Sequence, residues 1–290
     1  MIVDSHVHFW RLARGDNTAL SPEMKSIYAD REPAHLKPLM DTVGVNRAVA
    51  VQAAETLAEN FYTIGLSRRY GWISGVIGWI DPTSPSLPEE IDTFSGISVV
   101  KGVRPVRDDN RSVQWMLSPE AMKGIGELES SGLVLDMLVQ NPDEIPVADR
   151  IARTFPALSL VLNHCGKPDI RQDRRAVWER DIRRLASNRN VTCKLSGLMN
   201  CAPPGATADV IRSYSDTVLD QFGPDRIMWA SDWPPLDLAS SYDSWRQVCR
   251  ELLKDISHDD RAAIYGRTAT RVYRLDAVGG DTFETEFATP

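Results

Sequence analysis

Two histidines stand two positions apart near the start of the chain, at His6 and His8. In an extended strand alternate side chains share a face, so both imidazoles point the same way. Two imidazoles on one face can hold a metal ion or polarise a substrate. His164 and Asp232 end apolar runs much later in the chain. Together these four groups could ligate one divalent ion, or act as acids and bases around a carbonyl.

Strand–helix alternation along the chain predicts the scaffold that brings these residues together. Eight short runs, several rich in Val, Ile and Leu, predict strands of a parallel sheet at 2–8, 47–52, 73–79, 97–104, 133–139, 158–164, 191–196 and 226–232. Helical stretches lie between and after them, for example at 33–43, 56–70, 112–130, 143–154, 174–188, 206–222, 241–255 and 258–273. This order predicts an α/β fold, a single-domain (β/α)8 TIM-type barrel over 1–275, with a polar tail over 276–290. A doubly wound open sheet is the alternative, but the Gly-rich phosphate loop typical of its first strand is absent from the sequence.

Polar residues stand at or near the carboxyl ends of the predicted strands, where TIM barrels carry their catalytic groups. The set comprises His8, Gln52, Arg104, Gln140, His164, Lys194 and Asp232. Barrel closure brings the eighth strand beside the first, so Asp232 should stand next to His6 and His8. Trp10 and Trp233 adjoin these residues and are expected to line the pocket.

Each of these residues also has a purely structural interpretation. Asp232 could be a turn or N-cap carboxylate, because two prolines follow it. His164 could simply close its strand, Lys194 could extend to the barrel rim, and Arg104 could be an ordinary loop charge. For Asp4, which shares the face of His6 but lies deeper, an ion pair within the barrel is expected.

Three further local features carry predictions. The loop 9–32 is long for a strand–helix connection, which makes it a candidate lid over the site. Ser257 with Asp260 three residues later predicts a capping box at the start of the final helix. Cys165 adjoins His164, but neighbours in a strand point to opposite faces, so no Cys–His dyad is expected.

The composition argues against several classes of function. The chain has 290 residues and a formal net charge of −7. It shows no Lys/Arg stripe, which argues against nucleic acids and anionic membranes as partners. The apolar runs are shorter than the roughly 18 residues of a membrane span, and the start lacks the features of a signal peptide. We therefore expect a cytoplasmic protein, and its four cysteines, without a CxxC pair, are expected to be reduced.

Six motifs together resemble the amidohydrolase superfamily, in particular its amidohydrolase 2 branch and the sugar-lactonase group of fuconolactonases, rhamnonolactonases and pyrone-dicarboxylate lactonase. They are DSHVHFW at 4–10, VKGVRP at 100–105, VLNHCGKP at 161–168, CKLSGL at 193–198, MWASDWP at 228–234 and YGRTATRVYRL at 265–275. The resemblance implies a distorted TIM barrel with Asp232 as the base that activates water. It also implies that His6, His8 and Asp232 hold at most one divalent ion such as zinc, with His164 as a further ligand, and that several such lactonases need no metal. In other amidohydrolases a carboxylated lysine or a glutamate bridges two metals, and this residue has no clear counterpart here. Lys101 lies in the predicted fourth strand, but its side chain points to the face opposite to that of Arg104.

The expected activity is hydrolysis of a small-molecule sugar lactone to the open acid, as part of carbohydrate catabolism. His6, His8 or an ion would polarise the carbonyl, and His164 and Lys194 would help to hold the oxyanion. Substrate hydroxyls or a carboxylate would be fixed by Gln52, Arg104 and Gln140. Two rivals stay open. One is decarboxylation or isomerisation of a dicarboxylate, for which Arg104 and Arg107 are available, and the other is a catalytically silent binding protein.

Overall fold

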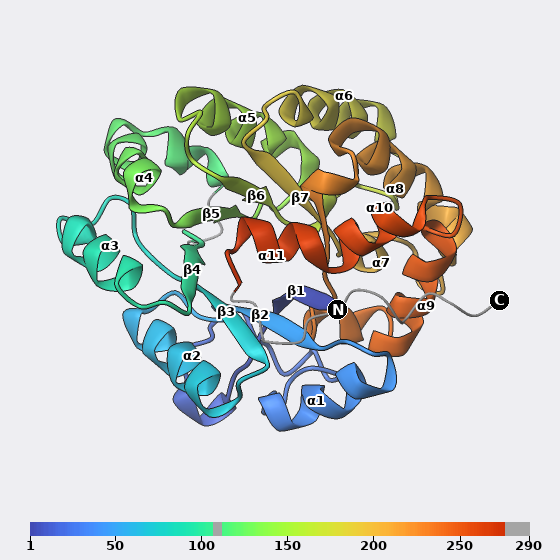
Figure 1. Cartoon of the computed structure of the whole chain (residues 1–290), viewed down its shortest axis with the longest axis horizontal. Helices are drawn as coiled ribbons and strands as arrows, with labels where there is room; N and C mark the ends of the chain where they lie inside the picture. Colours follow the sequence, from blue (N-terminus) through green and yellow to red (C-terminus); the bar gives the residue numbers. More distant parts are fainter. Residues whose placement is uncertain (107–111, 276–290) are drawn as a thin grey trace.

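Eight parallel strands follow one another in chain order around the centre of the molecule (Figure 1). The computed structural model describes residues 1–106 and 112–275. The strands are β1 (Val3–Val7), β2 (Arg47–Val51), β3 (Ile73–Gly78), β4 (Val100–Val103), β5 (Val134–Met137), β6 (Leu160–Leu162), β7 (Val191–Leu195) and β8 (Ile227–Trp229). A parallel bridge between Val7 and Trp233 links the chain after β8 to β1. The predicted single-domain (β/α)8 barrel is confirmed, and the open-sheet alternative is wrong. The expected tail over 276–290 and Arg107 lie outside the described residues.

Helices surround the barrel and cover its strands (Figure 1). They are α1 (Pro33–Thr42), α2 (Leu57–Arg69), α3 (Leu87–Ser95), α4 (Pro119–Ser131), α5 (Ile145–Thr154), α6 (Arg175–Ala186), α7 (Leu198–Cys201), α8 (Ala208–Phe222), α9 (Tyr242–Leu252), α10 (His258–Ala262) and α11 (Thr268–Val272), with a π-helical turn over Ala263–Arg267. The helix expected over 112–130 is instead a 3-10 turn, Val113–Leu117, followed by α4. The break falls at Ser118, whose extended backbone and side chain cap α4. Of the expected capping box the N-cap half is present, because Ser257 Oγ accepts from Asp260 N at 3.0 Å. The Asp260 carboxylate accepts from Ser257 Oγ and not from the Ser257 backbone nitrogen, as a capping box requires.

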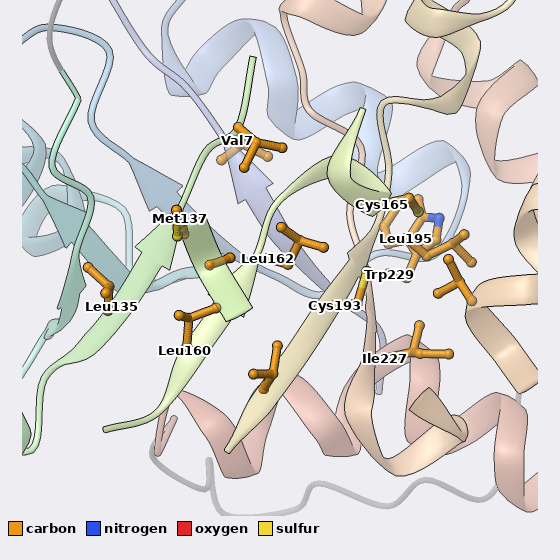
Figure 2. Packing of buried hydrophobic residues seen from close by; sticks show 14 of the residues in the cluster. Val7, Leu135, Met137, Leu160, Leu162, Cys165, Cys193, Leu195, Ile227 and Trp229 are labelled. Atoms are coloured by element: carbon orange, nitrogen blue, oxygen red, sulfur yellow. The ribbon is translucent and has the colours of Figure 1, made fainter. Parts of the chain in front are cut away.

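Apolar side chains fill the layer between the strands and the helices. Figure 2 shows this packing around β5 to β8, where residues such as Leu135, Leu160 and Leu195 are fully or almost fully buried. Burial of such side chains contributes about 1.5–3 kcal/mol each. The four cysteines are free, and no helix of the described residues is long and apolar enough to cross a membrane.

A second apolar cluster joins the inside of the barrel to the C-terminal helix. Inward-facing residues such as Val3, Val49 and Met228 pack with Val272 and Tyr273. In Figure 1, α11 crosses the barrel close to the N-terminus of the chain. The helix therefore closes the N-terminal face of the barrel, and the carboxyl ends of the strands are left to carry the site.

Lys101 belongs to that closed face. It is buried, and its Nζ donates to the backbone oxygen of Arg274 at 3.1 Å. It thus lies near the end of the described chain.

Candidate active site

Four side chains converge at the carboxyl ends of β1, β6 and β8. Asp232 Oδ1 lies 3.6 Å from His6 Nε2, 3.5 Å from His8 Nε2 and 3.7 Å from His164 Nε2. His6 and His8, whose Nε2 atoms are 3.0 Å apart, face the same side. The barrel therefore brings together the four residues that the sequence pattern predicted to meet. Asp232 contacts three histidines and is not merely a turn carboxylate.

Backbone conformation aims two of these side chains. His164 and Asp232 both have a left-handed backbone, with φ of 53° and 63°. The next three residues after His164 are left-handed as well, with φ of 51° at Cys165, 68° at Gly166 and 45° at Lys167. This conformation costs about 1–2 kcal/mol for each non-glycine residue. Strained backbone that the rest of the fold stabilises is typical of functional sites.

Gly197 makes room for His164. Gly197 has a φ of 71°, and a Cβ built on it would lie 2.6 Å from His164 Cβ. A side chain there would push His164 out of place, because real Cβ atoms essentially never come that close.

We expect Gly197→Ala to lower stability by about 2–4 kcal/mol through left-handed strain and overpacking, and to lower catalytic turnover with it. Urea unfolding and steady-state kinetics measure both effects. Gly205→Ala is the matched control, because Gly205 has a φ of 76° but no neighbour within 4 Å. Equal losses in the two variants would show that the contact with His164 has no role.

Each imidazole is held through its Nδ1 atom. His8 Nδ1 lies 2.9 Å from the backbone oxygen of Val51, and His164 Nδ1 lies 2.9 Å from Ser196 Oγ. His6 Nδ1 lies 3.0 Å from Lys194 Nζ. These partners fix the rings so that all three Nε2 atoms point toward Asp232.

Lys194 lies behind His6 and not at the barrel rim. The side chain is fully buried, and its Nζ donates to Asp136 Oδ2 at 2.6 Å. Tyr273 Oη donates to the same carboxylate, 3.3 Å from Oδ1. Because Asp136 and His6 occupy the ammonium group, the expected direct contact of Lys194 with an oxyanion does not fit this position.

The hydrogen bonds place the protons along this chain of groups. An ammonium only donates, so His6 Nδ1 accepts from Lys194 and the hydrogen of the neutral His6 ring lies on Nε2. A carbonyl oxygen only accepts, so His8 Nδ1 donates to Val51 and His8 Nε2 accepts. His6 Nε2 therefore donates to His8 Nε2, and the pair forms one ordered relay.

Burial and neighbouring charges set the protonation of the site. Burial lowers the pKa of His164 to about 3, and it also lowers the pKa of His8. For His6, burial and then the Lys194 charge hold the pKa well below its usual range. Burial alone would raise the pKa of Asp232, but the neighbouring His164 and His8 rings outweigh it and the pKa is lowered. Near neutral pH the site thus holds a charged carboxylate among neutral imidazoles.

A cavity of about 410 Å³ opens onto these residues, and a second of about 630 Å³ adjoins it. Arg104 and Gln140 line both cavities, whereas Gln52 lines only the larger. Arg104 is buried, and its Nη2 donates to the backbone oxygen of Gln52 at 2.8 Å. Gln52, Arg104 and Gln140 therefore lie around these adjoining cavities, and Arg104 is not an ordinary loop charge.

The loop 9–32 contributes one wall of the smaller cavity. Its lining includes Trp10 and, from the middle of the loop, Asn17, Ala19, Leu20, Met24 and Ile27. Trp10 Nε1 donates to the backbone oxygen of Ala29 at 2.8 Å, which ties the loop together. Trp233 is 1% exposed and packs against Phe9, with the ring centroids 6.1 Å apart. It is therefore a core residue rather than a lining residue of the described cavities.

Asp4 forms hydrogen bonds rather than the expected ion pair. Its carboxylate accepts from Ser231 N at 2.9 Å and from Tyr242 Oη at 2.9 Å. Burial raises the pKa of Asp4 to about 6. Asp4 thus ties β1 to the segment that carries Asp232, because Ser231 is the preceding residue. Cys165 is buried, and its Sγ donates to the backbone oxygen of Lys194 at 3.4 Å, so it forms no dyad with His164.

Sequence reasoning missed four residues of the site. Asp136 stands alone as a charge within the apolar run LVLDMLV, and Ser196 follows Lys194 in CKLSGL, so both carried a signal. Lys167 is part of the motif NHCGKP, but no role was assigned to it. Tyr273 lies far away in the sequence and carried no signal for a contact with Asp136.

The fold and the site define a (β/α)8-barrel protein with a histidine pair at the end of β1, a further histidine after β6 and an aspartate after β8. The chain belongs to the amidohydrolase family, whose family model matches residues 3–275. It is 32% identical to an L-fucono-1,5-lactonase of Burkholderia ambifaria, over 96% of this chain and 97% of that protein. An L-fucono-1,5-lactonase of Burkholderia multivorans is also 32% identical, with 94% and 96% covered. A crystal structure of an amidohydrolase from Burkholderia multivorans with bound zinc superimposes with a TM-score of 0.89 at 31% identity, covering 95% of this chain and 100% of that chain.

Proposed function

We propose that this protein is a hydrolase that opens a sugar-acid lactone to the free acid, as part of carbohydrate catabolism. The observation that carries the proposal is the geometry of Asp232, whose Oδ1 atom lies within 3.7 Å of the Nε2 atoms of three histidines and whose side chain lines a cavity. Full-length similarity to two L-fucono-1,5-lactonases supports a lactone as the substrate class. A lactone is a cyclic ester, and general-base activation of water suits its hydrolysis.

In the proposed reaction, Asp232 takes a proton from a water molecule, which then attacks the lactone carbonyl. General-base help of this kind contributes about 10²–10⁴-fold to the rate. His164 is held by Ser196 at the edge of the same cavity, where it can orient the water or the carbonyl oxygen. Lys194 acts on the reaction only through His6, because Asp136 and His6 surround its ammonium group.

The residues present fit one divalent ion. His6, His8 and Asp232 each offer a ligand atom within 4.8 Å of the others, and His164 Nε2 is a further candidate. Imidazole nitrogens and a carboxylate are a donor set that zinc accepts. Such an ion would supply polarisation of the carbonyl. Metal binding would require His6 to change its protonation. The hydrogen bond from Lys194 to Nδ1 keeps the hydrogen of the His6 ring on Nε2, and this hydrogen must leave before Nε2 can bind a metal.

We therefore expect at most one divalent ion per chain and lactone opening that largely survives chelation. Elemental analysis of the purified protein gives the metal content, and proton release before and after EDTA treatment gives the activity. Two ions per chain would contradict the proposal, and so would a complete loss of activity that added metal reverses. The untreated protein and the treated protein with restored zinc are the controls.

The mouth of the site favours a neutral polyhydroxylated lactone. Gln52 and Gln140 offer amide donors and acceptors, and each buried hydroxyl needs such a partner. A dicarboxylate would need several guanidinium groups, and Arg104 is the arginine that lines the cavities among the described residues. The proposed substrate is therefore a neutral six-carbon or deoxy-sugar aldonolactone.

A panel of lactones tests this choice by proton release. We expect a neutral aldonolactone to have a higher kcat/KM than any pyrone or muconate dicarboxylate lactone, and Arg104→Met to raise KM without abolishing turnover. If a dicarboxylate lactone is opened fastest, the proposed preference for neutral lactones is wrong, but the proposed lactonase activity stands. Carbon dioxide release without lactone opening would favour the decarboxylase alternative, and binding without turnover would favour a silent binding protein.

A further inference from the structure

Lys167 is the lysine that faces the cavity of Asp232 within the described part of the chain. Lys167, His164 and Asp232 line the same 410 Å³ cavity. Lys167 Nζ donates to Gln140 Oε1 at 3.1 Å. Lys194, by contrast, is fully buried and paired with Asp136. The lysine available to the substrate is therefore Lys167 and not Lys194 of β7, while Arg104 lines the same cavity and donates to the backbone oxygen of Gln52.

The left-handed turn after β6 gives Lys167 its position. Lys167 N donates to the backbone oxygen of His164 at 2.8 Å, and Gly166 N donates to that of Asn163 at 2.9 Å. The turn thereby presents both His164 and Lys167 to one cavity, although two residues lie between them in sequence. Backbone strain at a non-glycine residue is more costly than a relaxed loop, which favours a functional reason for this placement.

Lys167 and Asp232 are residues of opposite charge type that line the same cavity. Burial lowers the pKa of Lys167, and Asp232 is the foremost neighbouring charge that opposes this shift. Nevertheless, the ion pairs formed by the described residues do not include Lys167 with Asp232, which instead faces the three imidazoles. Both residues thus line one cavity without forming an ion pair within 4.0 Å, and a substrate carbonyl bound between them would turn its oxygen toward the cation Lys167.

We propose that Lys167, oriented by Gln140, donates to the lactone carbonyl oxygen and holds the oxyanion during ring opening; this inference rests on the proposed function. Asp232 takes a proton from water while the water oxygen bonds to the carbonyl carbon, and the π electron pair moves to the carbonyl oxygen beside Lys167. The carbonyl then re-forms, the ring carbon–oxygen bond breaks, and the proton on Asp232 passes to the leaving ring oxygen. The product is the hydroxy acid, which loses its carboxyl proton to solvent.

Kinetics of Lys167→Met on the best neutral aldonolactone test the proposal. Removal of one oxyanion donor lowers kcat by about 10²–10³-fold, and we expect KM to change much less, because the bond strengthens in the transition state. Lys123→Met is the matched control, since Lys123 is exposed on α4, and its kinetics should equal those of the wild type. If Lys167→Met does not fold, Lys167→Gln provides the same comparison.

Chemical restoration of the amine separates a catalytic role from a structural one. Lys167→Cys should be as slow as Lys167→Met, and treatment with 2-bromoethylamine should restore at least a tenth of the wild-type kcat by rebuilding a primary ammonium at this position. Wild-type protein treated in parallel controls for reaction at Cys201, which is partly exposed.

The outcomes distinguish this inference from the proposed function. If the wild type is active and the kcat of Lys167→Met lies within threefold of the wild-type kcat, the proposed role of Lys167 is refuted. The proposed lactonase activity would still stand. A loss confined to KM would also refute it, because Lys167 would then bind substrate without stabilising the oxyanion. A wild type that opens none of the lactones would overturn the proposed function, and this inference with it.

Discussion

Asp232→Asn is expected to lower kcat for lactone opening by at least about 100-fold, because an amide cannot take the proton of water. The exchange keeps the size of the side chain, and the backbone nitrogen of residue 232 still donates to the backbone oxygen of His6. The fold should therefore survive, which circular dichroism and thermal unfolding can verify. Asp243→Asn is the control, since Asp243 is an exposed carboxylate on α9. Near-normal turnover in Asp232→Asn would remove Asp232 from the mechanism.

The pH profile of the wild type adds a second readout for the same residue. The pKa of Asp232 is lowered from 3.8, so the base is charged above that pH and is protonated only as the pH falls through the lowered pKa. The neighbouring His164, with a pKa of about 3, is neutral over the same range. We therefore expect kcat/KM to keep its full value on the acid side down to about pH 4. A fall near pH 6.5 would show that an ordinary histidine is the base instead.

Lys194→Met is expected to destabilise the protein by about 3–5 kcal/mol, because it leaves the Asp136 carboxylate buried without its cation. Both side chains are fully buried, and their atoms are 2.6 Å apart. The remaining partner, Tyr273, is a neutral donor with a pKa well above its usual value, because burial disfavours its charged form. The free energy of unfolding, measured with urea, gives the size of the loss.

A double-mutant cycle shows whether the loss belongs to the pair. Asp136→Leu together with Lys194→Met removes both charges and should recover most of the stability, as replacement of buried ion pairs by apolar residues often does. Activity should not recover, because His6 has lost the donor at its Nδ1 atom. Lys37→Met is the control, since its ion pair with Asp41 on α1 is exposed and contributes less than about 1 kcal/mol. Additive losses at Lys194 and Asp136 would contradict the coupling.

The sequence predicted the site well where simple geometry decides the outcome. The alternation of side chains along a strand placed His6 and His8 on one face, and barrel closure placed Asp232 beside them. Both arguments use only the strand period and the order of the strands. The assignment of chemical roles to these residues stays a prediction until kinetics test it.

Depth within the barrel could not be predicted in the same way. Lys194 has the inward phase that its position in the strand implies, but the period does not say whether an inward side chain reaches the mouth or ends in the interior. Its partner Asp136 comes from another strand, and Tyr273 comes from the end of α11. Such contacts depend on the stagger of strands around the barrel, which a single sequence does not specify.

Local signals explain the remaining differences in the fold. Leu87, Ile91 and Phe94 of α3 follow a helical period and are buried, yet this helix was not among those expected, because the run is short and begins in a proline-rich segment. The continuous helix expected over 112–130 ignored Ser118, a strong N-cap residue directly before Pro119. The prediction for Trp233 relied on its neighbours in sequence, whereas the structure buries it against Phe9.

The contact between Tyr273 and Asp136 also has a consequence for biosynthesis. Translation proceeds from the N-terminus at about 5–20 residues per second, so His6 and His8 leave the ribosome long before Tyr273 does. Until α11 is made, the inner apolar residues of the barrel and the Lys194–Asp136 pair lack their cover at the N-terminal face. A nascent chain that stalls before Tyr273 would therefore expose the apolar end of the barrel to chaperones, and competence for catalysis would arise only after Tyr273 has been synthesised.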